Sequence, residues 1–418
     1  MYSRFTILFL ILLSSFISVG QIKKVLFVGN SYTYANDLPL ILSKLARSAG
    51  DSVYYASSTA GGQTLQGHSA SSATIGMMQQ GSWDYVVLQE QSQRPSFPMS
   101  QVSVEVFPYA KILCDTFRYY NNCSTPMFFM TWGRQNGDQG NCASWPPVCT
   151  YEGMDSLLNL RYRMMADSNE ALVSPVGAVW HYLRDNYPTM NLYSSDGSHP
   201  SLLGSYAAAC TFYSLVFKKS PLLISTDYGL SDSDASNIRN AAKLIAYDSL
   251  SKWNVGKFSP VSDFAVSGFM DSISTTNYSK YADAYLWDFG DGTTSTLFEP
   301  YHFYSIEGTY TVSLEVSKCG TKVVSDTTFI ILIGSIEDSK RINFSVAPNP
   351  VGEFFIVKAD YIINATNVCL YNLEGRKIKT FPSFSSSEKS FDVANLPRGV
   401  YFLSFVVNSE LIRIKIIK

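Results

Sequence analysis

Short apolar segments alternate with helix-like segments from Lys24 to about Trp253, and this alternation limits the possible folds more than any other feature. Residues 25–28, 85–88 and 127–130 are continuous apolar runs of strand length, as expected for parallel strands buried on both faces. The pattern predicts a three-layer α/β domain, in which ligands bind beyond the carboxyl ends of the strands. We expect helices at 38–49, 102–120, 154–171, 202–217 and 235–250, and a further strand at 172–179.

The pattern changes near Pro260, where short alternating strands and turns replace the helices. This change predicts two small all-β sandwich domains after the α/β domain. The strands most clearly expected in the first sandwich are 263–266, 284–287, 310–316 and 328–332. We expect an export signal at 1–20, the α/β domain at 21–257, the first sandwich at 258–334, and a linker with the second sandwich at 335–418.

The first twenty residues have the pattern of a secretory signal. A short basic start, Met1 to Arg4, precedes an apolar run at 5–17 and a small-residue cleavage site at 18–20. The apolar run is shorter than the roughly 20 residues that a membrane span needs. We therefore expect a mature chain that begins near Gln21, is exported, and has no transmembrane segment.

Export makes disulfides possible among the seven cysteines. Cys142 and Cys149 bracket a short loop and form the first candidate pair, with Cys114 and Cys123 as a weaker second pair. The remaining three, Cys210, Cys319 and Cys369, are expected to be buried thiols.

Composition and spacing exclude several classes of function. A net charge of −2 with 16% charged residues argues against a nucleic-acid-binding protein. The four histidines have no metal-ligand spacing, and Gly61-Gly62 is not followed by the Lys-Ser/Thr of a phosphate loop. We therefore expect neither a metal nor a cofactor.

Three residues have the chemistry of a nucleophilic hydrolase. Ser31 follows the first buried strand and Gly29, so its hydroxyl is expected at the carboxyl edge of the sheet. A serine in this position on its own is more often a helix cap. Asp196 and His199, however, share a late loop: histidine can remove the serine proton, and a carboxylate can orient the histidine.

The combination of Gly29-Asn-Ser31 with Asp196-Gly-Ser-His-Pro200 resembles the SGNH/GDSL-like hydrolase family. The resemblance covers about 24–217 and implies a flavodoxin-like fold, with Ser31 as nucleophile and Asp196 and His199 as its partners. The family usually has Asp where this chain has Asn30, which suggests a divergent Gly-Asn-Ser branch.

The resemblance also implies an oxyanion hole. Residues 59–64 match the family's second block, so Gly62, rather than Gly61, is expected to offer an N–H. The third block normally supplies an Asn, but the strand at 85–88 runs instead into a glutamine-rich segment. Counting without gaps places Gln93 at the Asn position, and Gln91 or Gln89 could donate in its place.

Three further residues are weaker candidates for lining the cleft. Trp132 could stack on a sugar, Arg134 could hold an acid group, and His68 follows the glycine-rich loop. Packing is the simpler interpretation of Trp132, and a surface charge is the simpler interpretation of Arg134. His181 is expected to be structural, and His302 to belong to the first sandwich.

Two more resemblances concern the second half of the chain. Trp287-Asp-Phe-Gly-Asp-Gly292 and Pro300-Tyr-His-Phe-Tyr304 resemble the PKD domain, an Ig-like module that usually spaces or binds. Four segments from Phe344 to Lys418 resemble the type A C-terminal sorting domain of the type IX secretion system. This resemblance implies a Bacteroidetes-like bacterium, passage through the type IX machinery, and then release or attachment at the cell surface.

The sequence thus predicts a secreted serine esterase that removes ester-linked groups from extracellular polysaccharide. Acetyl groups are the favoured esters. Polysaccharide is expected as the substrate by analogy, because the chain is exported and carries the attached modules. Two alternatives stay open: an inactive SGNH-fold protein that binds glycan or serves in adhesion, and an acyltransferase with the same triad.

Overall fold

In the computed structural model of the protein, residues 20–269, 271–332, 342–408 and 410–418 are described. Nearly all of the predicted export signal, and most of the predicted linker after residue 334, lie outside these ranges. Contacts within the chain define two compact units, one ending at Phe258 and the other spanning Ser259–Lys418.

The first unit is built on a parallel sheet in the strand order β2-β1-β3-β4-β5. Its central strands are apolar and buried, which is why each appears in the sequence as a continuous hydrophobic run. The predicted α/β class is confirmed. The strands are β1 (Ile22–Val28), β2 (Ser52–Ser58), β3 (Tyr85–Leu88), β4 (Thr125–Phe129) and β5 (Leu172–Ser174).

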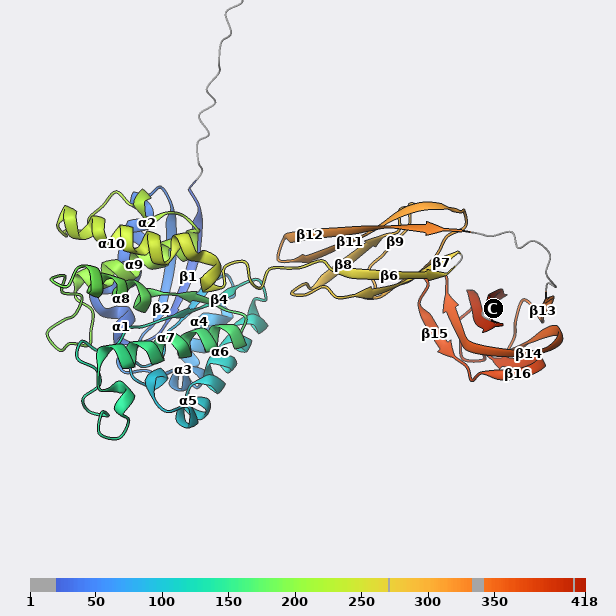
Figure 1. Ribbon diagram of the computed structural model, residues 1–418, viewed down its shortest axis with the longest axis horizontal. Coiled ribbons are helices and arrows are strands. Elements are labelled where there is room, and N and C mark those ends of the chain that lie inside the picture. The colour runs from blue at the N-terminus through green and yellow to red at the C-terminus, as the bar shows by residue number, and fades with distance from the viewer. Residues whose placement is uncertain (1–19, 270, 333–341, 409) are drawn as a thin grey trace, which may run out of the picture. The chain divides into compact units, whose positions relative to one another are not determined.

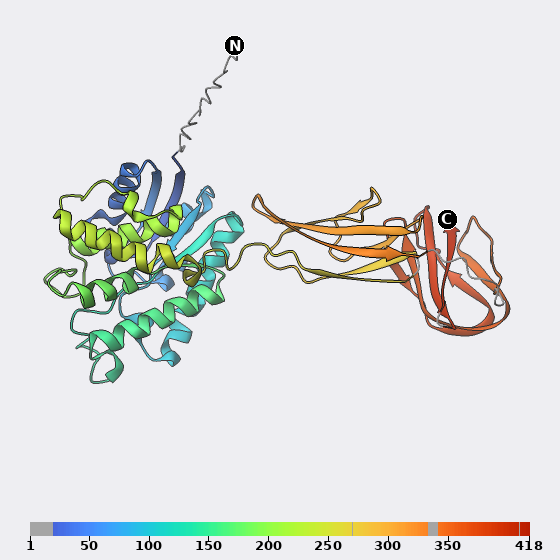
Figure 2. The ribbon, with the colours of Figure 1, turned by 45° about the horizontal axis from the view of Figure 1, so that its top comes forward.

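Helices cover both faces of this sheet (Figures 1 and 2). On one face α2, α9 and α10 pack together, and on the other α3 and α4 pack against α6. Helix α9 is buried from Gly204 to Phe217 because neighbouring helices cover its outer side, which explains its almost wholly apolar sequence. The helices are α1 (Ser31–Tyr34), α2 (Leu38–Ser48), α3 (Leu65–Ser69), α4 (Ser72–Gln79), α5 (Met99–Glu105), α6 (Phe107–Tyr120), α7 (Tyr151–Ser168), α8 (Val176–Asn186), α9 (Leu202–Phe217) and α10 (Asp232–Ile245).

Three local predictions differ from the structure. The helix expected at 102–120 is divided between α5 and α6, because Pro108 in the first turn of α6 cannot continue a preceding helix. The strand expected at 172–179 ends at Ser174, and α8 begins directly after Pro175. Strand β2 was not predicted, because an edge strand with alternating exposure has no continuous apolar run.

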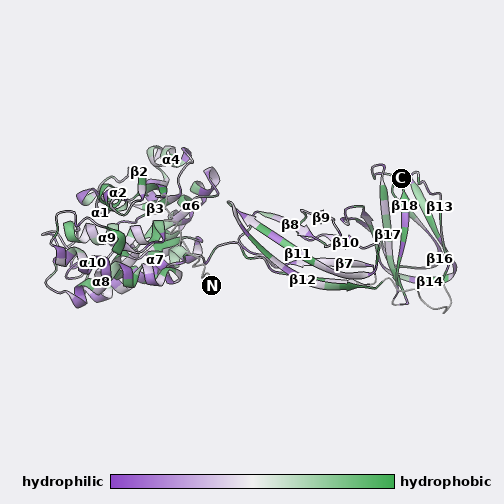
Figure 3. Cartoon of the chain, turned by 90° about the horizontal axis from the view of Figure 1, so that it is seen from above, coloured by the Kyte–Doolittle hydropathy of each residue, from purple (hydrophilic) through white to green (hydrophobic). Residues whose placement is uncertain are grey.

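The second unit begins with two antiparallel sheets, ordered β10-β7-β6 and β12-β11-β8-β9. Trp287 is fully buried between them, and its indole N–H donates to Leu297 O at 2.9 Å. Hydrophobic and hydrophilic residues alternate along β11 (Figure 3), the pattern of a strand with one covered face. The strands are β6 (Phe264–Phe269), β7 (Ser272–Asn277), β8 (Ala284–Asp288), β9 (Thr294–Ser295), β10 (Tyr301–Phe303), β11 (Gly308–Lys318) and β12 (Thr321–Ile331).

The chain ends in a further antiparallel array, ordered β13-β14-β17-β18, with β15 and β16 also paired to β14. Phe355, Leu403 and Phe405 lie in its core with no exposed surface. The prediction of β-rich modules after the α/β domain is confirmed. The strands are β13 (Phe344–Ala347), β14 (Phe354–Asn372), β15 (Lys377–Thr380), β16 (Phe384–Asp392), β17 (Val400–Val407) and β18 (Glu410–Ile417).

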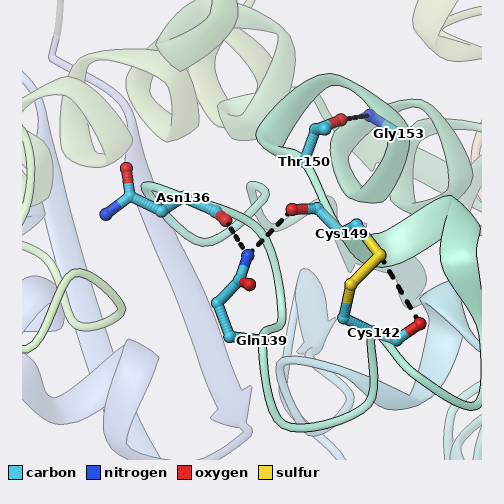
Figure 4. Close-up of a disulfide and its surroundings, with 6 residues drawn as sticks. All are labelled: Asn136, Gln139, Cys142, Cys149, Thr150 and Gly153. Carbon is cyan, nitrogen blue, oxygen red and sulfur yellow. Dashed lines mark hydrogen bonds between the residues drawn. A yellow bond between two sulfur atoms is a disulfide. The ribbon is translucent and has the colours of Figure 1, made fainter.

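The predicted Cys142–Cys149 disulfide is present, with the two Cα atoms 4.6 Å apart (Figure 4). Gln139 supports the same loop by donating to Asn136 O and Cys149 O, at 2.6 and 2.8 Å. The weaker predicted pair is wrong, because Cys114 is a free thiol on the buried face of α6.

Of the other three cysteines, two agree with the prediction and one does not. Cys210 and Cys369 are buried free thiols, as expected. Cys319 is exposed at the turn between β11 and β12, so its prediction as a buried residue is wrong. A turn that joins two exposed strand ends offers no core for it to enter.

Candidate active site

The first strand delivers Ser31 to the carboxyl edge of the sheet. β1 ends at Val28, and Asn30 caps α1 by accepting a hydrogen bond from Tyr32 N–H on its side-chain oxygen, at 3.1 Å. Gly29 is needed before the cap, because a Cβ there would lie 2.5 Å from Thr33 Oγ1 and 2.7 Å from Gln89 Oε1. Ser31 is therefore the first residue of a helical turn, where a backbone N–H has no intrahelical acceptor.

The partners of Ser31 come from the loop before α9. Ser194 N–H donates to His199 O at 2.8 Å and closes the loop. Asp196 Oδ1 accepts from the N–H groups of Ser198 and His199, at 3.0 and 2.9 Å. This turn leaves Asp196 Oδ2 facing the imidazole of His199.

The structure brings the three predicted residues into one hydrogen-bonded line. His199 Nε2 lies 2.8 Å from Ser31 Oγ, and His199 Nδ1 lies 2.5 Å from Asp196 Oδ2. The side chains of His199 and Asp196 are 40% and 48% exposed, so a substrate can reach them. A serine, histidine and carboxylate in this order can make a nucleophile, a proton carrier and its orienting group.

Hydrogen bonding keeps Asp196 ionised. Partial burial acts to raise the pKa of its carboxyl, but the bonds from the His199 ring and from the Ser198 and His199 N–H groups outweigh burial. Its pKa is held below the usual value. Asp196 is therefore in the charged state that stabilises an imidazolium.

A stack of aromatic rings supports the catalytic loop from beneath. Trp132 lies between Tyr32 and Trp180, with ring centroids 4.8 and 3.7 Å away. Its indole N–H donates to Ser198 O at 3.1 Å, and Tyr32 OH lies 2.6 Å from Ser198 Oγ. The stack thus connects the nucleophile turn, the end of β4, helix α8 and the loop of His199.

This arrangement corrects the weaker cleft predictions. Trp132 has no exposed surface, so it packs behind the site and cannot stack on a sugar. His68 is buried beneath the nucleophile turn, where its ring nitrogens contact Gly29 O at 2.7 Å and Thr74 Oγ1 at 3.0 Å. Arg134 is bound to the buried Asp138 at 3.1 Å, so its charge is already paired.

The three candidate glutamines differ in what their amides bind. Gln89 is fully buried and its Nε2 donates to Asn30 Oδ1 and Glu90 O, so it holds the nucleophile turn and has no hydrogen left for an oxyanion. Gln91 donates to Ser92 Oγ and Gln93 Oε1. Gln93 donates to Asp138 Oδ2 at 2.7 Å and keeps one N–H of its amide.

Two backbone groups complete the candidate oxyanion hole. Within the described residues, the N–H groups of Ser31 and Gly62 have no hydrogen-bond acceptor. Gly62 has a φ of +67°, which is a left-handed conformation suited to glycine. The neighbouring Gln63 O accepts from Asn30 Nδ2 at 2.9 Å, which ties the Gly62 loop to the nucleophile turn.

Several supporting residues were missed from the sequence. Tyr32 OH contacts Ser198 Oγ in the catalytic loop, Asp138 accepts from Gln93, and Glu90 O accepts from Gln89. The only sequence signal of Tyr32, Ser198, Asp138 and Glu90 is their closeness to the motifs. Among the described residues, no group of three His, Cys, Asp or Glu side chains is placed to hold a metal ion. No helix in the same part of the chain has the length and apolar character required to cross a membrane.

The comparisons with known proteins assign the second half of the chain. Residues 269–331 match the family model of the PKD domain, and 345–418 match that of the secretion system C-terminal sorting domain. The chain ends in a secretion sorting domain. This type IX sorting domain marks the protein for secretion and for attachment at the cell surface, and it follows the PKD domain in the order expected from the sequence.

Each of the similar proteins described next covers only part of the chain. A DUF4886 family protein from Bacteroides uniformis aligns with 56% of this chain and 96% of its own, at 15% identity and a TM-score of 0.47. A putative SGNH hydrolase from Slackia heliotrinireducens aligns with 46% of this chain and 97% of its own, at 24% identity and a TM-score of 0.38. Collagenase ColQ1 of Bacillus cereus is 38% identical over 96 residues, which are 22% of this chain and 10% of the collagenase. The chain thus spans only a small part of that collagenase.

Proposed function

We propose that the α/β unit is a serine esterase whose nucleophile is Ser31. The observation that carries the proposal is the continuous line from Ser31 Oγ through the His199 ring to Asp196, with contacts of 2.8 and 2.5 Å. The exposure of His199 and Asp196 beyond the carboxyl ends of the parallel strands also supports it.

The chemistry follows from these contacts. His199 Nε2 takes the proton of Ser31 Oγ as the oxygen attacks the ester carbonyl, and Asp196 stabilises the resulting imidazolium. The N–H groups of Ser31 and Gly62 face the developing oxyanion, with the remaining N–H of Gln93 as a third donor. His199 then gives its proton to the departing alcohol, which leaves an acyl group on Ser31.

Water completes the cycle. His199 removes a proton from a water molecule as that water attacks the acyl carbonyl, and then returns this proton to Ser31 as the free acid departs. Attack by a sugar hydroxyl in place of water would instead transfer the acyl group.

The substrate class is proposed from the attached domains. A protein that carries a sorting domain for the cell surface meets polymers outside the cell, and acetylated polysaccharides supply esters there. We therefore propose acetyl groups on extracellular polysaccharide as the esters removed. Passage through the type IX secretion machinery is proposed for the same reason.

The test is acetate release from p-nitrophenyl acetate and from acetylated xylan, by the mature chain and by Ser31→Ala. We expect release that falls by about 10³-fold or more in the variant. Equal release by both proteins would contradict the role of Ser31. No release by a folded wild-type protein would contradict the esterase proposal and favour an inactive glycan-binding domain.

A further inference from the structure

A polar pocket lies against the outer side of the catalytic loop. Its volume is about 400 Å³, and its walls are formed by the segment after β4, the end of α8 and the chain leading to Asp196. Gln135 N–H donates to Gly197 O at 2.8 Å, so one wall is bonded directly to the loop that carries Asp196 and His199. Its hydrogen-bonding side chains include those of Gln135, Arg184, Thr189, Asn191, Ser194 and Ser195.

Arg184 is the only charged residue among those that line this pocket. Its guanidinium lies 3.8 Å above the ring of Tyr151, and its Nη2 donates to Gln135 O at 3.3 Å. These contacts hold the planar guanidinium of Arg184 in place before any ligand binds. A guanidinium group that is already fixed in place loses less conformational entropy when it binds an anion.

The positive charge of Arg184 is not paired with a carboxylate in the part of the chain that the structure describes. The nearby acids have other partners. Asp155 and Asp185 both contact the ring of His181, at 2.9 and 3.3 Å, and Asp196 contacts His199. The pocket therefore offers a preorganised cation without a counter-ion, next to neutral hydrogen-bonding groups.

We propose that this pocket binds an acidic sugar residue of the polysaccharide, with the uronate carboxylate paired to Arg184. Guanidinium and carboxylate groups match in plane and spacing, and two parallel N–H···O bonds can form between them. The surrounding Thr, Asn, Gln and Ser side chains can bind the sugar hydroxyls. The inference rests on the proposed function in one respect, because it takes the ligand to be part of the ester substrate.

The test is the binding of trigalacturonate to the full mature chain, measured by calorimetry. The matched control ligand is the same trimer with its carboxyl groups reduced to alcohols. We expect the reduced trimer to bind at least about tenfold more weakly. Affinity for trigalacturonate should also fall as salt is added, because the pair is partly exposed.

Two variants examine the assigned residues. Arg184→Met removes the cation, and Thr189→Glu places a negative charge at an exposed position of the same pocket. Each should weaken trigalacturonate binding at least about tenfold. Arg47→Met, at an exposed site on α2, should leave binding unchanged. Thermal unfolding establishes that each variant is folded, and Thr189→Glu keeps the test valid if loss of the Tyr151 contact destabilises Arg184→Met.

The results separate this inference from the esterase proposal. No binding of trigalacturonate, equal binding of both trimers, or unchanged affinity in folded Arg184→Met and Thr189→Glu would each overturn the pocket assignment. Acetate release without uronate binding would therefore contradict the pocket alone. Uronate binding that depends on Arg184, without any ester hydrolysis, would support the pocket and contradict the esterase.

Discussion

The carboxamide of Gln89 forms two hydrogen bonds with Asn30, one from Asn30 N–H to Gln89 Oε1 at 3.0 Å and one from Gln89 Nε2 to Asn30 Oδ1 at 2.9 Å. Asn30 also donates to Gln63 O at 2.9 Å, and Gln89 Oε1 accepts from Thr33 Oγ1 at 2.9 Å. One buried pair of amides therefore fixes the nucleophile turn, the Gly62 loop and the end of β3 relative to one another.

Gln89→Ala should lower both activity and stability. The change leaves Asn30 N–H and Thr33 Oγ1 without their acceptor in a buried site, which costs about 1–3 kcal/mol for each unsatisfied group. Misplacement of Ser31 should lower kcat by roughly 10- to 100-fold. Urea unfolding and ester turnover measure the two effects, with the exposed Gln79→Ala as control. Wild-type values of both quantities in Gln89→Ala would show that the pair has no positioning role.

Asn30→Asp should weaken catalysis although it restores the residue usual in the SGNH family. An aspartate keeps the oxygen that caps α1, but it loses the N–H that binds Gln63 O. It places a carboxylate oxygen beside Gln63 O instead. The loop that carries Gly62 should then shift, with a loss of about tenfold in kcat/KM. An equal or higher kcat/KM than wild type would mean that the Asn30–Gln63 bond does not hold the oxyanion donor.

Asp196→Asn tests the orienting role of the carboxylate. An amide cannot stabilise the imidazolium and favours the wrong tautomer of His199, so kcat should fall by about 10⁴-fold while the protein stays folded. Asp185→Asn is the matched control, because Asp185 also contacts a histidine ring but lies outside the triad. A loss of similar size in both variants would point to a general electrostatic effect.

Glu90 should make stability depend on pH. Burial raises its pKa to about 7 from an ordinary 4.5, against the lowering effect of hydrogen bonds from Gln91 and Leu65 N–H. The folded chain therefore holds this proton more tightly than the unfolded chain. The resulting stabilisation is complete below pH 4.5 and is lost as pH rises toward 7, by about 3 kcal/mol.

The measurement for Glu90 is the free energy of unfolding on either side of these two pKa values, for wild type and Glu90→Gln. The variant cannot ionise, so the part of the pH dependence due to Glu90 should disappear. The same pH dependence in both proteins would show that Glu90 is charged in the folded state.

The sequence predicted the α/β class and its buried strands because parallel strands need apolar residues on both faces. It also indicated Ser31, Asp196 and His199, because nucleophilic catalysis limits which residue types can follow a strand or share a loop. It could not indicate the directions of the side chains. Trp132 follows a strand on the ligand side, yet its ring turns inward between Tyr32 and Trp180.

The direction of the Gln89 side chain could not be predicted from the sequence either. A run of glutamines at the family's third block indicates amide donors, but not which amide is buried. Gln89, directly after β3, is enclosed under Asn30, whereas Gln91 donates to Gln93 and Gln93 donates to Asp138. Arg184, which lies outside every motif, could be connected with the site only through its pocket.

The central claim is that Ser31 is an activated nucleophile, and its most direct test is reaction of the mature chain with a fluorophosphonate followed by peptide mass spectrometry. We predict one adduct, on Ser31, which is lost in Ser31→Ala and strongly slowed in His199→Ala. An adduct on another serine, or no adduct on the folded wild-type protein, would contradict the account.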